Sequence, residues 1–277
     1  MQRFEGTFRG PGEVDLWWSG WIPDRTARAV VVVAHGIAEH WGRYHRLAAY
    51  FSGRGLAVYG FDYRGHGKSA GRRCQVDTFS RYSTDFALFI DMVRARHPGQ
   101  KVFIFGHSLG ALVALNQAGA GRQIVSGVIV SGVPLHPRPS VPSAVVSLLR
   151  PLAFIAPGLG LYRLNSASLS HDRAVVKAYD DDPLVYRGKL PARTVIGLIR
   201  SARGLAQTVR TITVPVLILH GEEDRLCDPR GSRTVYARAG SKDKTLKFFP
   251  GCYHEILNEP QGEQVLTDMM EWLDRRI

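Results

Sequence analysis

The sequence is poor in cysteine. Its 277 residues include three, Cys74, Cys227 and Cys252. Because this number is odd and the spacing does not match that of metal ligands, both a disulfide framework and a structural zinc site are disfavoured. The first 21 residues also lack the apolar segment of a secretory signal peptide, since charges and glycines run through them. Both observations favour a reduced, cytoplasmic protein.

The sequence also lacks a long uninterrupted apolar run. Its most apolar stretch, residues 144–161, contains Arg150, Pro151 and Pro157. A membrane-spanning helix needs about 20 predominantly apolar residues, and a proline in its interior interrupts the backbone hydrogen bonds. The stretch therefore predicts a buried or interfacial helix rather than a membrane span.

Acidic residues are in the minority. Lys and Arg number 36 against 24 Asp and Glu, which gives a formal net charge of +12. The basic residues are scattered, and no helix-turn-helix, zinc-finger or aromatic RNA-binding pattern accompanies them, so no nucleic-acid partner is expected. We expect a solvated basic surface and, after it, a weak attraction that gives peripheral contact with an anionic membrane surface. The sequence does not indicate an oligomeric state.

What the sequence does contain is an alternation of strand and helix patterns, which predicts a mostly parallel sheet with helices on both faces. Continuous apolar, β-branched runs are typical of strands buried on both faces, and apolar residues at helical spacing predict the segments between them. The expected strands are 29–34, 56–61, 101–105, 124–130, 214–219 and 245–249, preceded by an edge hairpin of residues 3–9 and 14–21. The expected helices are 43–54, one capped by Ser83 or Thr84 and ended by Pro98, then 108–118, 229–239 and 261–275.

The alternation is interrupted once. Between Pro134 and Arg210 the chain is rich in Pro, Leu and Ser and shows no clear strand pattern. We interpret residues 134–210 as a mainly helical insertion above the sheet. Residues 1–133 and 211–277 are then the core of a single domain, a size at which one continuous core is common.

Two segments match the pattern G-x-S-x-G, one around Ser69 and one around Ser108. The nucleophile elbow of a hydrolase is a tight strand-to-helix turn in which small flanking residues let a serine project its hydroxyl from a strained backbone. Ser108 follows the expected strand 101–105 and opens the next expected helix, whereas Ser69 lies in a glycine-rich, charged loop. We therefore predict Ser108 as the nucleophile; the alternative for Ser108 is an ordinary helix N-cap.

A serine hydroxyl needs a base to take its proton, and the base needs an acid that fixes its tautomer. In this fold the partners follow the serine in the order acid, histidine. Of the ten histidines, only His254 lies between the last expected strand and the last expected helix, so we predict it as the base. Asp224 follows the preceding strand and is the predicted acid. Glu222, Glu223 and Asp228 are the competing candidates.

Acyl transfer also needs donors for the developing oxyanion, usually two backbone N–H groups. Leu109, the residue after the nucleophile, supplies one of them from the start of its helix. The second is expected from the loop after the first long buried strand, and we assign it to Ile37. His35, in the same loop, is interpreted as structural.

These residues resemble a known family, the monoacylglycerol lipase branch of the α/β-hydrolases, which includes bacterial members. The shared blocks are HGIAEHWGRY (35–44), DYRGHGKS (62–69), GHSLG (106–110), YDDDPLVYRG (179–188), HGEEDRL (220–226) and YHEILNEP (253–260). The second, third and fifth blocks occur across many α/β-hydrolases and imply the fold and the triad. The other three are closer to the monoacylglycerol branch and implicate lipid esters.

The resemblance implies an α/β-hydrolase fold with a mostly parallel eight-stranded sheet, helices on both faces and a helical cap formed by residues 134–210. It implies hydrolysis of a monoacylglycerol to fatty acid and glycerol through an acyl-enzyme on Ser108, with no cofactor and no metal. By the same matching, apolar residues of the cap line an acyl tunnel or rest on a membrane surface, and packing against the sheet is an equal alternative. The cap residues concerned are Leu148, Leu152, Phe154 and Ile155.

Three polar residues, Glu39, Arg43 and His107, match positions near the glycerol end of the family's substrate site. An internal ion pair explains Glu39 and Arg43 equally well. Within the enzyme class, a lysophospholipase or a broad-specificity carboxylesterase is the alternative. Outside it, the alternatives are a non-catalytic ligand-binding protein of the same fold, disfavoured because all three triad residues are present, and a basic nucleic-acid binder, for which only the net charge speaks.

Overall fold

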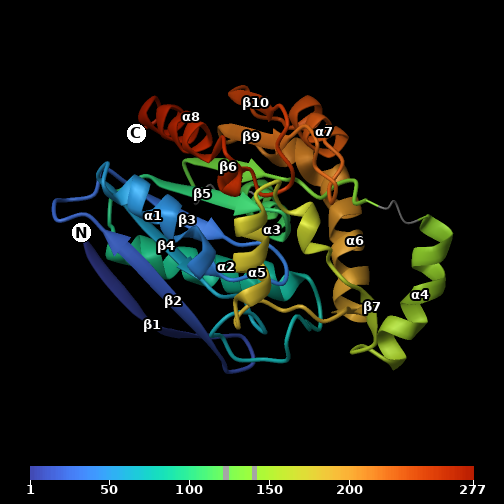
Figure 1. The fold of residues 1–277 in the computed structure, drawn as a ribbon. Helices are drawn as coiled ribbons and strands as arrows, with labels where there is room; N and C mark the ends of the chain where they lie inside the picture. The colour runs from blue at the N-terminus through green and yellow to red at the C-terminus, as the bar shows by residue number, and fades with distance from the viewer. Residues whose placement is uncertain (121–124, 139–141) are drawn as a thin grey trace.

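The computed structural model describes residues 1–120, 125–138 and 142–277. One sheet of eight strands has the order β1-β2-β4-β3-β5-β6-β9-β10 (Figure 1). The pairs β1–β2 and β2–β4 are antiparallel, and the other neighbours are parallel. The strands are β1 (Gln2–Gly10), β2 (Val14–Ile22), β3 (Ala29–Ala34), β4 (Leu56–Phe61), β5 (Val102–His107), β6 (Gly127–Ser131), β9 (Val216–Gly221) and β10 (Lys244–Phe249). The predicted eight-stranded, mostly parallel sheet is confirmed.

Helices cover both faces of this sheet because the central strands are apolar on both sides. The helices beside the sheet are α1 (His45–Ser52), α2 (Ser80–Arg96), α3 (Leu109–Gly119), α7 (Arg230–Arg238) and α8 (Gly262–Asp274). In β3, Val30 and Val32 pack into one hydrophobic cluster with α2 and α3, whereas Val31 and Val33 pack into another with α1 and α8. Strand residues that alternate between two clusters place the core on both sides of the sheet.

The chain leaves the sheet between β6 and β9, which pair directly with each other. The segment between them is mainly helical, and its two short strands pair only with each other. Its elements are α4 (Ser143–Ile155), β7 (Gly160–Tyr162), α5 (Arg173–Asp181), β8 (Leu190–Pro191) and α6 (Ala192–Thr208), with 3-10 turns at Ser166–Ser168 and Val209–Thr211. We refer to this segment as the insertion. Its exact division from the core, after residue 133 and before residue 211, stays a prediction.

Some element boundaries differ from those expected. Helix α2 begins at Ser80, before the predicted cap at Ser83 or Thr84. The Thr84 hydroxyl instead donates to the carbonyl O of Ser80 at 3.0 Å, which is a bond made inside a helix. The predicted helix 43–54 is a 3-10 turn, Trp41–Tyr44, followed by α1. Of the predicted strand 124–130, the first residue lies outside the described residues, and β6 covers most of the rest.

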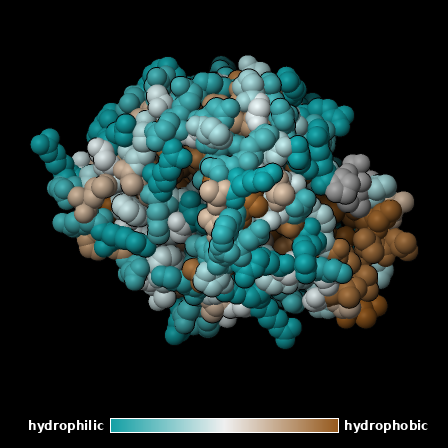
Figure 2. Space-filling model, in the orientation of Figure 1, coloured by the Kyte–Doolittle hydropathy of each residue, from teal (hydrophilic) through white to brown (hydrophobic). Residues whose placement is uncertain are grey.

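Helix α4 presents an apolar face to the outside. Leu148, Phe154 and Ile155 are each 79% exposed, and Figure 2 shows a hydrophobic lobe at the right of the molecule, where α4 lies. The opposite side of α4 packs through Val146 and Ala153 against α6. Among residues 1–120, 125–138 and 142–277, no helix combines the length and the apolar character needed to cross a membrane.

Candidate active site

Ser108 lies at the turn between β5 and α3, and its backbone is strained. Its φ of 53° and ψ of −114° fall in a region that residues with a side chain rarely adopt. Glycines on either side permit this turn. A Cβ at Gly106 would lie 2.4 Å from the carbonyl O of Gly110, and one at Gly110 would lie 1.9 Å from that of Ala34. Strand and helix therefore approach too closely for any side chain there, which is the geometry of a nucleophile elbow.

Ser69, the second serine that matches the motif, has a different environment. Its hydroxyl accepts a hydrogen bond from the backbone N–H of Trp17 at 2.8 Å and donates to the carbonyl O of Asp62 at 2.5 Å. These two bonds hold the loop after β4 against β2. The Ser69 hydroxyl is therefore used structurally.

His254 and Asp224, from the loops after β10 and β9, are brought together. Nδ1 of His254 lies 2.7 Å from Oδ2 of Asp224, and both residues are buried. Oδ1 of Asp224 accepts hydrogen bonds from the backbone N–H groups of Leu226 at 2.8 Å and Cys227 at 2.9 Å. The carboxylate is thus fixed in place, and it holds the His254 ring with a proton on Nδ1 and the lone pair on Nε2.

The three competing acids lie elsewhere. Glu222 and Glu223 are exposed, and Oε2 of Glu223 lies 3.7 Å from Nε2 of His171. Asp228 forms ion pairs with Arg138 at 3.0 Å and Arg230 at 2.8 Å. Only Asp224 among the four candidates contacts His254.

The protonation of the Asp224–His254 pair follows from its surroundings. Burial raises the pKa of Asp224. The charge of His254 and the hydrogen bonds from His220 and His254 lower this pKa by more than burial raises it, so it lies well below the usual range. Burial lowers the pKa of His254, but the charge and hydrogen bond of Asp224 outweigh it and hold that pKa above the usual value of about 6.5. An ionised acid is therefore placed to stabilise an imidazolium ring.

A second imidazole, that of His220, also contacts Asp224. Its Nε2 lies 3.0 Å from Oδ2 of Asp224, and its Nδ1 lies 2.6 Å from Oγ of Ser232. His220 is fully buried at the end of β9. No role for His220 could be predicted from the sequence, because a histidine at the end of a strand has no distinguishing spacing. Only the three-dimensional arrangement shows that it supports the acid.

Asp224, Cys227 and His254 form a group whose potential metal-ligand atoms all lie within 4.8 Å of one another. A carboxylate offers about four acceptor positions. Those of Asp224 are taken by the two histidines and the two backbone N–H groups. This group does not fit a metal site, because its only carboxylate is already saturated by donors.

Ser108 and His254 line the same cavity, which has a volume of about 320 Å³. Ile37 and Leu109 line it as well, and within the described part of the chain neither of their backbone N–H groups donates to another protein group. Among the residues that the structure describes, none forms a hydrogen bond with Ser108 Oγ; catalytic hydrogen bonds are often long before substrate binds. The four predicted reaction-centre residues thus converge on one space.

Most of this cavity is apolar, and the insertion supplies much of its wall. The side chains that it contributes are mainly leucine, isoleucine and valine: Leu149, Leu161, Leu164, Leu190, Val195, Ile196, Leu198 and Ile199. Apolar walls with a few convergent polar groups are typical of pockets for small organic ligands. The cavity is suited to an alkyl chain.

The cap residues predicted for the tunnel are placed differently. Leu152, Phe154 and Ile155 do not line this cavity, and neither does Leu148. The reason is the rotation of α4 about its axis: Val146, Leu149 and Ala153 face inward, so the side of the helix that carries Leu148 and Ile155 faces outward. The structure thus places Leu148, Phe154 and Ile155 on the outer surface, whereas Leu152 is half-buried and lies outside the cavity lining.

A second, smaller cavity also reaches Ser108, and buried ionisable side chains form part of its wall. This cavity, about 10 Å³ and thus enough for one water-sized group, is lined by Ser108, His254, His107, Glu39 and Glu255 among others. His107 donates to or accepts from Ser131 Oγ at 2.9 Å, and its ring lies 4.6 Å from that of His254. Burial, then the proximity of His254, lowers the pKa of His107 to about 3, so this ring is neutral.

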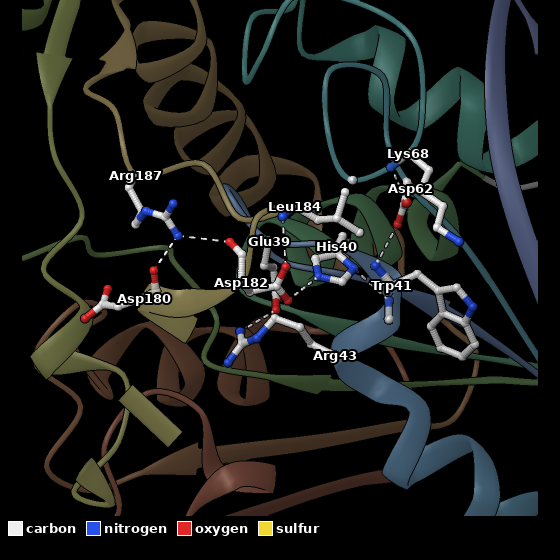
Figure 3. A network of polar contacts seen from close by, with 12 residues as sticks. Glu39, His40, Trp41, Arg43, Asp62, Lys68, Asp180, Asp182, Leu184 and Arg187 are labelled. Carbon is white, nitrogen blue, oxygen red and sulfur yellow. Dashed lines mark hydrogen bonds and ion pairs between the residues drawn. The ribbon is translucent and has the colours of Figure 1, made fainter. Parts of the chain in front are cut away.

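Glu39 and Arg43 form the ion pair that sequence analysis left open. Arg43 Nη1 lies 2.7 Å from Glu39 Oε2 (Figure 3), and the guanidinium also binds Glu255 through both Nη atoms, at 2.5 Å and 2.6 Å. Arg43 lines only an adjacent cavity, so it lies behind the two carboxylates rather than beside Ser108. Sequence analysis missed Glu255, although it directly follows His254, because a single loop acid carries no pattern.

The fold and the site together define a serine hydrolase of the α/β-hydrolase class. Residues 25–261 match the sequence profile of the family described as Serine aminopeptidase, S33. Over 271 residues the chain is 37% identical to a monoacylglycerol lipase of Mycolicibacterium smegmatis, a match that covers 98% of this chain and 97% of that protein. The monoglyceride lipase of Homo sapiens is 34% identical over 259 residues, with 92% and 86% covered.

A solved structure agrees with these matches. The crystal structure of the Paleococcus ferrophilus monoacylglycerol lipase is similar with a TM-score of 0.84 and 33% identity, and all of both chains is covered. The chain therefore belongs to this family of α/β-hydrolases and, within it, to the monoacylglycerol lipase branch.

Proposed function

We propose that the protein hydrolyses monoacylglycerols to a fatty acid and glycerol, with Ser108, His254 and Asp224 as the catalytic triad. The observation that carries the proposal is the meeting at Ser108 of an apolar cavity and a second cavity whose wall includes the carboxylates of Glu39 and Glu255. A monoacylglycerol has the same two parts, an alkyl chain and a polyol, on either side of its ester bond. The similarity of this chain to proteins named as monoacylglycerol or monoglyceride lipases supports this substrate.

In the first half of the reaction, Ser108 Oγ attacks the ester carbonyl while Nε2 of His254 takes the hydroxyl proton. Asp224 stabilises the imidazolium that forms. The N–H groups of Ile37 and Leu109 donate to the tetrahedral oxyanion; losing one such donor in other hydrolases costs about 100- to 1,000-fold in rate. Glycerol leaves with the proton from His254, and the acyl group remains on Ser108.

In the second half, water attacks the acyl-enzyme and His254 takes a proton from it. The same N–H groups stabilise the second oxyanion. Collapse of this intermediate releases the fatty acid and returns the proton to Ser108. Every group that this cycle needs is supplied by side chains and backbone of the chain itself.

The insertion acts in this proposal as a cap over the acyl chain. Its inward-facing side chains form much of the apolar cavity wall. The outward face of α4 rests on a lipid surface from which substrate is taken. Transfer of exposed apolar side chains such as Phe154 and Ile155 from water to this surface lowers the free energy. The net charge of +12 favours an anionic surface. We propose a cytoplasmic enzyme in peripheral contact with membrane.

A labelling experiment and a substrate panel test the proposal. A fluorophosphonate probe should label the protein, and Ser108→Ala should abolish both labelling and hydrolysis; labelling that persists in this variant contradicts the assignment of the nucleophile. Monoolein, an oleoyl lysophospholipid and a short p-nitrophenyl ester are then compared by kcat/KM. We expect monoolein to be preferred, and a clear preference for the lysophospholipid would overturn the substrate assignment.

A further inference from the structure

A groove with a volume of about 950 Å³ lies between the insertion and the core, and neither Ser108 nor His254 lines it. Residues of α4, of α6 and of the start of α2 form most of its wall. Arg193, Gly197 and Arg200 recur in it at helical spacing, so one face of α6 is turned toward it. A space of this size is large enough for a small organic ligand.

The charges in this groove are mainly positive. Arg150, Arg193 and Arg200 line it, and Asp77 is the one acid among its lining residues. The Asp77 side chain is 75% exposed and lies 3.6 Å from Arg193, which is too long for a hydrogen bond. Positive charge is therefore in excess, and the groove is suited to an anion.

Two of the three arginines have free donors. Arg193 is partly engaged, because its Nε donates to the carbonyl O of Ala153 at 3.1 Å and its Nη2 to that of Phe154 at 3.3 Å. Within residues 1–120, 125–138 and 142–277, no hydrogen bond or ion pair engages the guanidinium of Arg150 or Arg200. Both guanidinium groups are thus available to a ligand, and arginine binds phosphate oxygens through such paired N–H groups.

Hydroxyl groups add neutral donors to the same groove, those of Thr78, Ser80, Ser83 and Ser201. Thr78 and Ser80 bond each other at 2.8 Å, which leaves one hydroxyl hydrogen of the pair free. Ser201 accepts from the Asn116 amide at 3.3 Å and keeps its own hydrogen. Guanidinium and hydroxyl donors together match a ligand with several acceptor oxygens, as a phosphate ester has.

The groove adjoins the apolar outer face of α4. Phe154 lines the groove and is 79% exposed, and the neighbouring Ile155 is exposed to the same extent (Figure 2). Arg150 lies one turn before Phe154 on the same helix. A ligand that joins an anionic head to acyl chains can place its head on the arginines and its chains against α4. A soluble phosphate ester would leave the apolar face uncovered.

We propose that this groove binds the headgroup of an anionic phospholipid, with Arg150 and Arg200 as donors to its phosphate. The bound lipid is not the substrate, because the groove does not contain Ser108. Phosphatidylglycerol suits the groove, whereas the choline cation of phosphatidylcholine is repelled by the arginines. The proposal rests on the proposed function for the contact of α4 with lipid, but it does not depend on catalysis.

The test measures binding by sedimentation to vesicles of phosphatidylcholine and to vesicles of phosphatidylcholine and phosphatidylglycerol in equal parts. The unaltered protein should bind the mixed vesicles more tightly. Arg150→Gln/Arg200→Gln should weaken binding to mixed vesicles about tenfold, because each arginine near an anionic surface adds to the attraction. Binding to phosphatidylcholine should stay within about twofold. Unchanged binding of this variant to mixed vesicles would overturn the proposal.

Arg94→Gln/Arg210→Gln is the matched control, since it removes the same charge from two exposed side chains outside the groove. Its binding to mixed vesicles should fall less than about threefold. A loss as large as that of the groove variant would attribute the attraction to net charge alone and overturn the proposal. Both double variants should unfold at the temperature of the unaltered protein, because all four side chains are exposed.

Glycerol 3-phosphate distinguishes a lipid headgroup from a soluble phosphate ester. Calorimetry at constant ionic strength should give a Kd weaker than about 1 mM for the unaltered protein. Tighter binding that is lost in Arg150→Gln/Arg200→Gln would assign the groove to soluble phosphate esters and overturn the lipid assignment. None of these assays measures hydrolysis, so inactivity toward monoolein would contradict the proposed function alone.

Discussion

Side chains at the proposed reaction centre are buried, whereas those on the outer face of helix α4 are exposed. Ser108, Asp224 and His254 are 9%, 0% and 3% exposed, and several hydrogen bonds fix the last two. On α4, Leu148 and Phe154 are 79% exposed, although apolar patches of this kind are uncommon on proteins that work in water alone. The proposed catalytic residues are thus buried, whereas the side chains proposed to meet a lipid surface are left unpacked.

The insertion itself repeats this contrast. Next to α5, Asp182 binds Nε2 of His40 at 2.8 Å (Figure 3), and the Tyr186 N–H donates to the carbonyl O of Ala38 at 2.8 Å. Both contacts tie α5 and the chain after it to the loop that carries Ile37. Helix α4 has its buried contacts mainly with α6. The part of the insertion that adjoins the loop of Ile37, a predicted oxyanion donor, is thus anchored, and the outward-facing part is not.

The largest expected effect comes from the most tightly held residue. Asp224→Asn should lower kcat about 10,000-fold, because an amide at this position no longer stabilises the imidazolium and favours the wrong tautomer of His254. Steady-state hydrolysis of p-nitrophenyl butyrate measures it. Glu223→Gln is the control and should leave kcat within about twofold. If Glu223→Gln inactivates the enzyme and Asp224→Asn does not, the acid is misassigned.

A smaller loss is expected one contact further from the reaction. His220→Leu should lower kcat/KM about tenfold, because Asp224 loses a donor to Oδ2, and a hydrogen bond to a charged group is worth about 1.5–3 kcal/mol. His220→Gln retains an N–H donor and should recover most of the rate. Equal losses in the two variants, with unchanged thermal unfolding, would contradict a positioning role for His220.

The pH dependence tests the same buried pair without mutation. His254 accepts a proton only when it is neutral, so kcat/KM should fall about tenfold per pH unit as pH drops below its pKa. Since Asp224 raises that pKa, the midpoint of the acid limb should lie above about 6.5. The pKa of His107, about 3, places its titration far below this range. An uncharged ester is the substrate, and a midpoint below 6.5 would contradict the assignment.

The smallest effect is expected on α4, and only with an aggregated substrate. Replacing Leu148, Phe154 and Ile155 by serine should weaken binding to vesicles with anionic phospholipid about tenfold, since less apolar surface leaves water. Vesicle sedimentation measures it. Hydrolysis of a soluble short ester should stay within about twofold.

A single change on another helix is the control for this variant. Leu88, on α2, is also exposed, at 41%. Leu88→Ser should leave vesicle binding unaltered. If it weakens binding as much as the α4 variant does, or if the α4 variant loses activity toward the soluble ester, α4 has a structural role rather than a surface one.

Much of this architecture could be predicted from local patterns. The central strands are continuous apolar runs because both of their faces are buried, and Ser108 could be separated from Ser69 by the strand before it and the helix after it. Patterns of this kind are local, and they survive in the folded protein because the core depends on them. They account for the sheet, its helices and the place of the elbow.

The features that were missed depend on contacts between distant segments. The packing of α4 against α6 decides which face of α4 turns inward. The sequence of α4 is apolar on most sides, so it does not indicate this face. Glu255 gains its partner from Arg43, 212 residues away in the chain. His220 differs, because Asp224 follows it by only four residues, and the contact depends on how the loop after β9 folds back. The spacing of residues in the sequence reveals neither kind of contact.

The close approach at Gly110 has a practical consequence for protein engineering. With the Ala34 carbonyl 1.9 Å from where a Cβ would stand, saturation libraries that include this codon will consist mainly of inactive clones. Attempts to retune acyl-chain preference should instead diversify Leu149, Leu161 and Leu198, whose side chains border the apolar cavity without supporting the elbow.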